Sequence, residues 1–185
     1  MIEKLRLAGF GGQGIMFMGK VLAHAGMLGN KHVTWIPSYG PEMRGGTANC
    51  SVIISDSEIG EPVASRPDFL VAMNEPSLRK FSAAVRPGGV IFVNTSLIAD
   101  LPLRDDVTVV NVAVNDLARS AGVPGAINMV MLGAMLPYLK GVDRHLIEEA
   151  IRENVPATRQ HMLEGNLKAL TMGLGATPGQ PVTAQ

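Results

Sequence analysis

Leu5-Arg6-Leu7-Ala8-Gly9-Phe10-Gly11-Gly12-Gln13-Gly14 is the stretch that decides the fold of this chain. A short apolar strand passes through a glycine turn into a helix-like run over residues 15–28. Such a turn lets the backbone approach a phosphate, and the free N–H groups of the first helical turn then point at the anion. Gly9, Gly11 and Gly14 match the spacing G-x-G-x-x-G, but glycines also serve tight turns and close helix–sheet packing. The stretch therefore predicts an α/β protein, and the ligand of the turn depends on the rest of the chain.

Strand and helix patterns alternate along most of the sequence. Short apolar or alternating runs predict strands near residues 4–8, 33–36, 48–54, 69–73, 90–93 and 107–110. Helical patterns lie near residues 14–28, 77–85, 114–120, 126–140, 144–154 and 159–171. We expect Pro37 to end the second strand, Pro137 to kink or stop a helix, and Asp143 to cap the helix that follows it.

Five or six strands with helices between them predict a three-layer α/β/α sandwich with a mostly parallel sheet. The second and third strands are joined by a loop without a helical pattern, so at least one strand can run antiparallel and make the sheet mixed. No internal repeat or linker divides the chain, and we expect one domain over residues 1–172. The Gly- and Pro-rich residues 173–185 are expected to form a flexible tail.

The composition argues against several classes of protein. The 185 residues have a formal net charge of zero, which indicates no broad basic surface for nucleic acid or for an anionic membrane. Cys50 is the only cysteine, so the chain alone cannot supply the ligands of an iron–sulfur cluster or a structural zinc. No apolar run is long enough to span a bilayer and no signal-peptide pattern opens the chain, so we expect a cytoplasmic protein.

The dinucleotide interpretation of the turn needs a carboxylate at the end of the second strand, where it would bind the ribose hydroxyls. That strand ends in Trp35-Ile36-Pro37-Ser38, with no Asp or Glu and without the arginine of an NADP site. No Gly-Lys-Ser/Thr follows the turn, so it is not a P-loop either. The turn therefore stays a candidate for binding a pyrophosphate or a carboxylate, but it lacks the ribose-binding carboxylate that would make an NAD site specific.

A second informative stretch joins two predicted strands: Ser38-Tyr39-Gly40-Pro41-Glu42-Met43-Arg44-Gly45-Gly46. Its glycines and proline define backbone turns, and it places Tyr39, Glu42 and Arg44 near strand ends. Ligands of open α/β sheets bind at the carboxyl ends of strands, so we expect this loop and the glycine turn to line one crevice. Arg44 could pair with a phosphate or a carboxylate there. Alternatively, Glu42 and Arg44 form an ion pair that only stiffens the loop.

No catalytic set and no metal site stands out in the sequence. Ser-His-Asp, paired-carboxylate and Cys-His spacings are missing from it. We expect Asn128 to cap the helix at 126–140, with a hydrogen bond to a neighbouring loop as the alternative. The methionines of that helix are expected in the core, Cys50 in a buried strand, and His24 in a packed or solvated position. The chain by itself thus indicates a binding surface.

With both glycine-rich stretches in hand, the sequence resembles the gamma subunit, or gamma domain, of the 2-oxoacid:ferredoxin oxidoreductases. The matching segments are residues 9–14, residues 38–48 and Asn128-Met129-Val130-Met131-Leu132-Gly133-Ala134. The resemblance implies an oxidative decarboxylation, in which a 2-oxoacid, coenzyme A and oxidised ferredoxin become an acyl-CoA, carbon dioxide and reduced ferredoxin. It also implies that thiamine diphosphate and iron–sulfur clusters are bound by partner subunits, and that this chain is one subunit of the enzyme, inactive alone and without a tightly bound cofactor.

In this family the gamma domain adjoins the active site and is associated with coenzyme A binding and access. Coenzyme A carries a pyrophosphate and a 3′-phosphate, which suit a glycine turn without a ribose-binding acid. Gly11, Gly12 and Gln13 are then expected to give backbone or amide contacts, and Arg44 an anion or subunit contact. The full set of residues implied at the coenzyme A site is Gly9, Gly11, Gly12, Gln13, Gly14, Ser38, Tyr39, Glu42, Arg44, Gly45 and Gly46.

The length of the chain resembles separately encoded subunits of the 2-oxoglutarate type, while pyruvate, branched-chain 2-oxoacid and indolepyruvate enzymes use similar gamma chains. The implied partners are alpha and beta subunits, a ferredoxin-like delta subunit as a further candidate, and ferredoxin as electron acceptor. The isolated chain could also form a homo-oligomer. Two other hypotheses stay open: a stand-alone nucleotide-binding oxidoreductase, and a purely structural interaction subunit whose glycine loops shape an interface.

Overall fold

The computed structural model describes residues 1–39, 47–99 and 104–176. The strands are β1 (Ile2–Phe10), β2 (His32–Tyr39), β3 (Thr47–Ser55), β4 (Phe69–Ala72), β5 (Val90–Asn94) and β6 (Thr108–Val112). The α-helices are α1 (Ile15–Leu28), α2 (Glu75–Phe81), α3 (Val114–Ser120), α4 (Ile127–Met135), α5 (Arg144–Asn154) and α6 (Leu163–Ala176). Short 3₁₀ segments follow α2, α4 and α5, namely η1 (Ser82–Ala84), η2 (Leu136–Tyr138) and η3 (Ala157–Met162).

The six strands form one sheet in the order β2-β3-β1-β4-β5-β6. β3 runs antiparallel to both β1 and β2, whereas β1, β4, β5 and β6 pair in parallel, so the predicted mixed sheet is confirmed. The expectation that Pro37 ends the second strand is wrong, because Pro37 lies inside β2 opposite Cys50. β2 is an edge strand, and an edge strand tolerates a residue without a backbone N–H.

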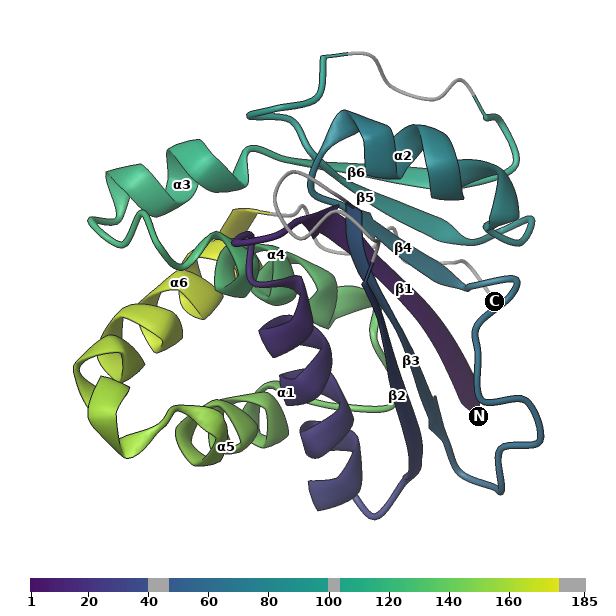
Figure 1. Cartoon of the computed structure of the whole chain (residues 1–185), viewed down its shortest axis with the longest axis horizontal. Coiled ribbons are helices and arrows are strands. Elements are labelled where there is room, and N and C mark those ends of the chain that lie inside the picture. The colour runs from purple at the N-terminus through teal and green to yellow at the C-terminus, as the bar shows by residue number, and fades with distance from the viewer. Residues whose placement is uncertain (40–46, 100–103, 177–185) are drawn as a thin grey trace.

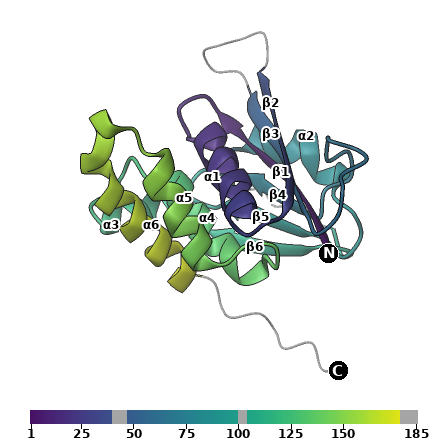
Figure 2. The same cartoon turned by 90° about the horizontal axis from the view of Figure 1, so that it is seen from below.

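Helices cover the two faces of the sheet unequally, as Figures 1 and 2 show: α1, α4, α5 and α6 lie on one side and α2 on the other. The strands alternate between these two cores, as period-two side chains require. In β4, Phe69 and Val71 join the large core under α1 and α4, while Leu70 and Ala72 join the small core under α2. The predicted α/β/α sandwich is therefore confirmed, with one thick and one thin helical layer.

A polar side chain organises the thin face beside β3. Arg6 of β1 donates from Nη1 to Asn49 Oδ1 at 2.9 Å and from Nη2 to the Ala64 carbonyl at 2.9 Å. Its guanidinium also lies 5.6 Å from the centre of the Phe81 ring. Arg6 thereby ties β1 to the connection that leads from β3 to β4, where no helix covers the sheet. Partial burial lowers the pKa of Arg6.

Near the start of β1, Glu3 fixes the connection between α4 and α5. Its carboxylate is buried and accepts hydrogen bonds from the backbone N–H groups of Lys140 and Gly141, both at 2.8 Å. Burial raises the pKa of Glu3, against the lowering effect of these two donors. The first strand and the C-terminal helical layer are therefore joined directly, across more than 130 residues of sequence.

Helices α4 and α6 approach each other backbone to backbone. A Cβ atom built on Gly133 would lie well below 3.0 Å from the Leu170 carbonyl oxygen, and one built on Gly173 equally close to that of Val130. The start of the predicted tail at residue 173 is wrong, since α6 continues to Ala176 and Gly173 is buried in this crossing. Residues 177–185 lie outside the described part of the chain. Over the described residues, no helix has the length and apolar character that a membrane crossing requires.

Candidate functional site

The two glycine-rich stretches end at the same edge of the sheet. β1 and β2 both run antiparallel to β3, so their carboxyl ends lie together with the start of β3 between them. The register places Ala48 of β3 opposite Gly9 on one side and opposite Tyr39 on the other. Two strand spacings separate the ends of β1 and β2 by roughly 10 Å. Ser38 and Tyr39 thus close β2 beside the glycine turn, while Glu42, Arg44, Gly45 and Gly46 lie outside the described residues.

Two of the turn's glycines are required by contacts inside the protein. A Cβ on Gly9 would lie 2.6 Å from Gln13 Oε1 and 3.0 Å from the Met73 Cβ. Gly14 has φ of +74°, and a Cβ there would collide with the Asn128 side chain. Packing of neighbouring side chains therefore explains Gly9 and Gly14 without any ligand.

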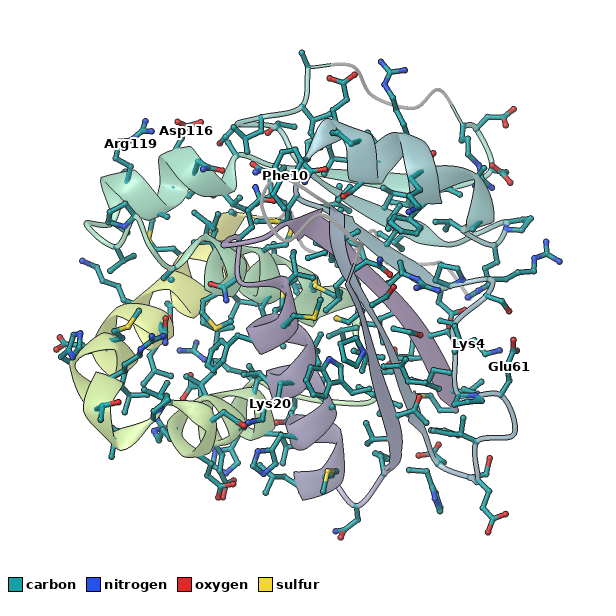
Figure 3. All side chains as sticks on the ribbon, viewed as in Figure 1. Lys4, Phe10, Lys20, Glu61, Asp116 and Arg119 are labelled. Carbon is teal, nitrogen blue, oxygen red and sulfur yellow. The ribbon has the colours of Figure 1, made fainter. Side chains whose placement is uncertain are left out.

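The tip of the turn has a different environment. Gly11 and Gly12 are exposed, and Gly12 has φ of +92° with no atom of the described residues within 4 Å of the place where a Cβ would stand. Figure 3 shows Phe10, the last residue of β1, at the base of this tip. Gly12 supplies a left-handed backbone conformation, and the open space beside it leaves room for a ligand.

Gln13 holds the turn closed from within. Its Oε1 accepts a hydrogen bond from the Phe10 N–H at 2.7 Å, and its Nε2 donates to the Met73 carbonyl at 3.3 Å. Asn74 Nδ2 also donates to Gln13 Oε1, at 3.4 Å. The amide that was expected to contact coenzyme A is therefore engaged with β1 and with the end of β4. Among the residues named by the sequence, Gln13 has the clearest structural role.

Asparagines extend this amide network across the edge. Asn94, fully buried at the end of β5, donates to the Met73 carbonyl at 3.2 Å and to Asn115 Oδ1 at 2.9 Å. Asn74 caps α2 by accepting from the Ser77 N–H at 2.9 Å. These asparagines are not among the predicted site residues, although Asn74 and Asn94 directly follow predicted buried strands. Neutral amides, which neither donate nor accept a proton at ordinary pH, therefore fix the strand ends.

The N-terminus of α1 points its free donors at the same region. Among the described residues no side chain caps it, and its first turn holds no acidic residue. The first N–H groups of a helix have no partner within the helix and carry its positive dipole end. The uncapped end of α1 is thus suited to an anion.

Further along the edge, the carboxylate of Asp116 in α3 already has two partners, Ser96 Oγ at 2.7 Å and Arg119 at 3.3 Å. Figure 3 shows Asp116 and Arg119 on the outer side of α3.

Several secondary expectations are now decided. Asn128 does not cap α4, whose N-cap is Ala126; its Nδ2 instead donates to the Gly14 carbonyl at 3.2 Å, the alternative named above. Cys50 is buried, and burial raises the pKa of its thiol to about 12. His24 is packed, with Nε2 at 2.9 Å from Glu153. Asp143 caps α5 by accepting from the Leu146 N–H at 3.0 Å, as predicted.

The strand order also explains why the turn departs from a dinucleotide site. In such a site the ribose-binding carboxylate follows the parallel strand next to β1. Here the neighbour on that side is β3, which runs antiparallel and begins at this edge instead of ending there. Over the described residues, no group of three or more metal-ligating side chains gathers anywhere in the fold.

Comparison with known proteins identifies the family. The model of the pyruvate ferredoxin/flavodoxin oxidoreductase family matches residues 4–176. The chain belongs to this family. The resemblance to its gamma subunits, inferred from the two glycine-rich stretches, is confirmed.

Relatives in the oxidoreductase family differ in how much they add to this fold. The 2-oxoglutarate synthase subunit KorC of Methanocaldococcus jannaschii is 35% identical, over 94% of this chain and 92% of its own length. The ketoisovalerate oxidoreductase subunit VorA of Methanothermobacter marburgensis is 38% identical over 92% of this chain, but the chain spans only 35% of VorA. The same fold therefore occurs as a separate subunit and as part of a longer one.

Solved structures agree on the architecture. The gamma subunit of a keto/oxoacid ferredoxin oxidoreductase from Geobacter sulfurreducens superposes with a TM-score of 0.81 at 31% identity, covering 94% of this chain and 97% of that one. A 2-oxoglutarate:ferredoxin oxidoreductase from Magnetococcus marinus, solved with 2-oxoglutarate, coenzyme A and succinyl-CoA bound, gives 0.86 at 20% identity. It covers 95% of this chain and 31% of that protein, and at this identity it shows the fold alone.

Proposed function

We propose that this chain is the gamma component of a multi-subunit 2-oxoacid:ferredoxin oxidoreductase, which converts a 2-oxoacid, coenzyme A and oxidised ferredoxin into an acyl-CoA, carbon dioxide and reduced ferredoxin. Membership of the family and near full-length similarity to KorC support this assignment. Both ketoisovalerate and 2-oxoglutarate enzymes stand among the relatives, so the proposal covers 2-oxoacids as a class.

Within that enzyme, we assign the chain a binding role, with the redox chemistry on partner subunits. One cysteine cannot hold an iron–sulfur cluster, and Cys50 is buried inside a strand. The described edge presents neutral amides and backbone donors, which suit recognition of an anion and not proton transfer. Alpha and beta subunits, with a ferredoxin-like delta subunit where present, would then supply thiamine diphosphate and the clusters.

The observation that carries the binding role is the exposed Gly11–Gly12 tip in front of the uncapped α1 helix. A phosphate of coenzyme A could approach this backbone closely and accept hydrogen bonds from the first-turn N–H groups. The Magnetococcus marinus protein, solved with coenzyme A bound, contains the same fold within its longer chain, so the proposed ligand is one that an enzyme with this fold uses. Gln13 contributes by holding the turn in shape, and Arg44 stays a candidate for a direct contact.

The test is steady-state kinetics of the complex co-expressed with its alpha and beta subunits. Gly12→Val fills the open side of the tip, and Arg44→Ala removes the candidate cation; we expect each to raise the KM for coenzyme A at least about tenfold. The KM for the 2-oxoacid should not change.

Gly122→Val is a matched control, because Gly122 is exposed, has φ of +72° and likewise has no described atom within 4 Å of its Cβ position. It carries a similar backbone strain at the end of α3, away from the tip. Unchanged coenzyme A kinetics in both Gly12→Val and Arg44→Ala would exclude this binding role and favour a purely structural subunit. Binding of NAD(P) by the isolated chain in calorimetry would favour a stand-alone nucleotide-binding oxidoreductase.

A further inference from the structure

A pocket of about 390 Å³ lies in the thick helical layer, between the start of α1, the start of α4 and the connection from α5 to α6. Its volume is within the range of small-molecule sites, roughly 300–1,000 Å³. Phe17 and Val155 form an apolar part of its wall. Gly14, the last residue of the glycine turn, also lines the pocket. Figure 3 shows Lys20 on the side of α1 that faces α5 and α6.

Two cations line this pocket without a carboxylate partner in the described part of the chain. Lys20 comes from α1 and Arg159 from η3, and both are exposed and form no ion pair there. Other arginines of this layer do pair, since Arg144 and Arg152 both contact Glu148. The pocket therefore keeps two positive charges available to an anion.

A buried amide faces the same space. Asn166 of α6 is only 7% exposed and lines the pocket, yet its side chain has no hydrogen-bond partner among the described residues. Asn128, also 7% exposed, donates to the Gly14 carbonyl and leaves its own oxygen without a described donor. Buried side-chain amides usually have a partner in native proteins, and the Asn166 amide, which lines the pocket, is available to hydrogen-bond a molecule bound there.

We propose that this pocket binds a small organic anion, with a carboxylate or phosphate group between Lys20 and Arg159, hydrogen-bonded by the Asn166 amide. The organic part of the ligand packs on Phe17. The volume of the pocket limits the ligand to a small molecule. The ligand is expected to be an anion because both charged side chains of the lining, Lys20 and Arg159, are cations. This site does not depend on the coenzyme A assignment, which concerns the exposed tip of the turn.

The experiment is isothermal titration calorimetry of the full-length chain with inorganic phosphate, with hexanoate and with adenosine monophosphate. We expect saturable one-to-one binding of at least one probe, with a Kd of about 1 mM or tighter. Hexanoate binding alone would identify a carboxylate ligand with an apolar chain. Binding of phosphate, or tighter binding of adenosine monophosphate, would identify a phosphate ester.

Three variants assign the binding to this pocket. Asn166→Leu and Arg159→Gln should each weaken it at least about tenfold. Lys168→Gln is the control, because Lys168 is an exposed cation on the same helix that is not part of the lining; it should leave the affinity unchanged. Since Asn166 has no described partner, Asn166→Leu should also keep or raise the Tm of the ligand-free chain.

The proposal is overturned if none of the three probes binds saturably. It is also overturned if Arg159→Gln leaves the affinity unchanged, a result that does not depend on the Asn166 variant folding. Gly12→Val, which tests the coenzyme A assignment, alters no residue of this lining, so failure of one proposal is distinguishable from failure of the other.

Discussion

Glycine does two different things in two parts of this molecule. In the turn at residues 9–14 it makes room for side chains and for a left-handed backbone, and the tip at Gly11–Gly12 stays exposed. In the α4–α6 crossing, Gly133 and Gly173 let two backbones touch deep inside the helical layer. The glycine turn therefore has an accessible surface, whereas the α4–α6 crossing is filled by protein backbone and has no room for a ligand. A glycine in the sequence therefore indicates function only when the structure leaves the space beside it open.

The largest expected effect is at the crossing. Gly173→Val should lower the free energy of unfolding by more than about 3 kcal/mol, because the new side chain would displace the backbone of α4. Urea denaturation of the purified chain measures it, with soluble yield as a second readout. Gly175→Ala is the control on the same helix, where no atom of the described part of the chain lies within 4 Å of the Cβ position, and it should be neutral or slightly stabilising. Equal stability of the two variants would contradict the close crossing.

A smaller effect separates two glycines of the turn itself. Gly12→Ala should cost about 1–2 kcal/mol, because only the positive φ is strained. Gly14→Ala should cost at least about 1 kcal/mol more, since its Cβ must also displace Asn128. Thermal and urea unfolding of both variants measure the difference. If Gly12→Ala were the more damaging of the two, the space beside Gly12 would not be open.

Gln13→Ala tests whether the turn is held from inside. Removal of the side chain leaves the Phe10 N–H without its acceptor, which should cost about 1–3 kcal/mol. Hydrogen exchange at Phe10 should accelerate, while exchange in α5 and α6 should follow only the change in global stability. Unchanged protection at Phe10 would show that the turn does not depend on this amide.

The smallest effect concerns Cys50, against which Gly19 of α1 packs. Burial raises the pKa of its thiol from 9.0 to about 12, so the folded state disfavours the thiolate. The associated stabilisation is present below about pH 9 and is lost as the pH rises towards 12. Native protein should therefore react negligibly with a thiol reagent at pH 8, and denatured protein should react fully. Rapid reaction of the native chain would show that α1 lifts off the sheet.

Much of the fold follows from local patterns in the sequence. The bounds of α3 and α5 agree with the prediction. For α5 the reason is local, because the N-cap residue Asp143 accepts a hydrogen bond from the first turn of the same helix. Pro37 misled the prediction, since a proline is tolerated only where a strand lies at an edge, and edge position is a property of the whole sheet. The predicted start of the tail at residue 173 was too early for a similar reason. Glycine disfavours a helix locally, but Gly173 lies within α6 because only a glycine lets the backbone of α4 approach so closely.

The sequence by itself determined the α/β class, the resemblance to the gamma subunits and the two glycine-rich stretches, because each depends on residues close together in the chain. Only the tertiary structure decided which of those residues are free to meet a ligand. Gly9, Gln13 and Gly14 are engaged by Met73, Asn74 and Asn128, residues that lie about 60 to more than 110 positions away. Contacts over such separations leave no local pattern, so the exposed Gly11–Gly12 tip and the pocket beneath Lys20 and Asn166 emerged only once the chain was folded.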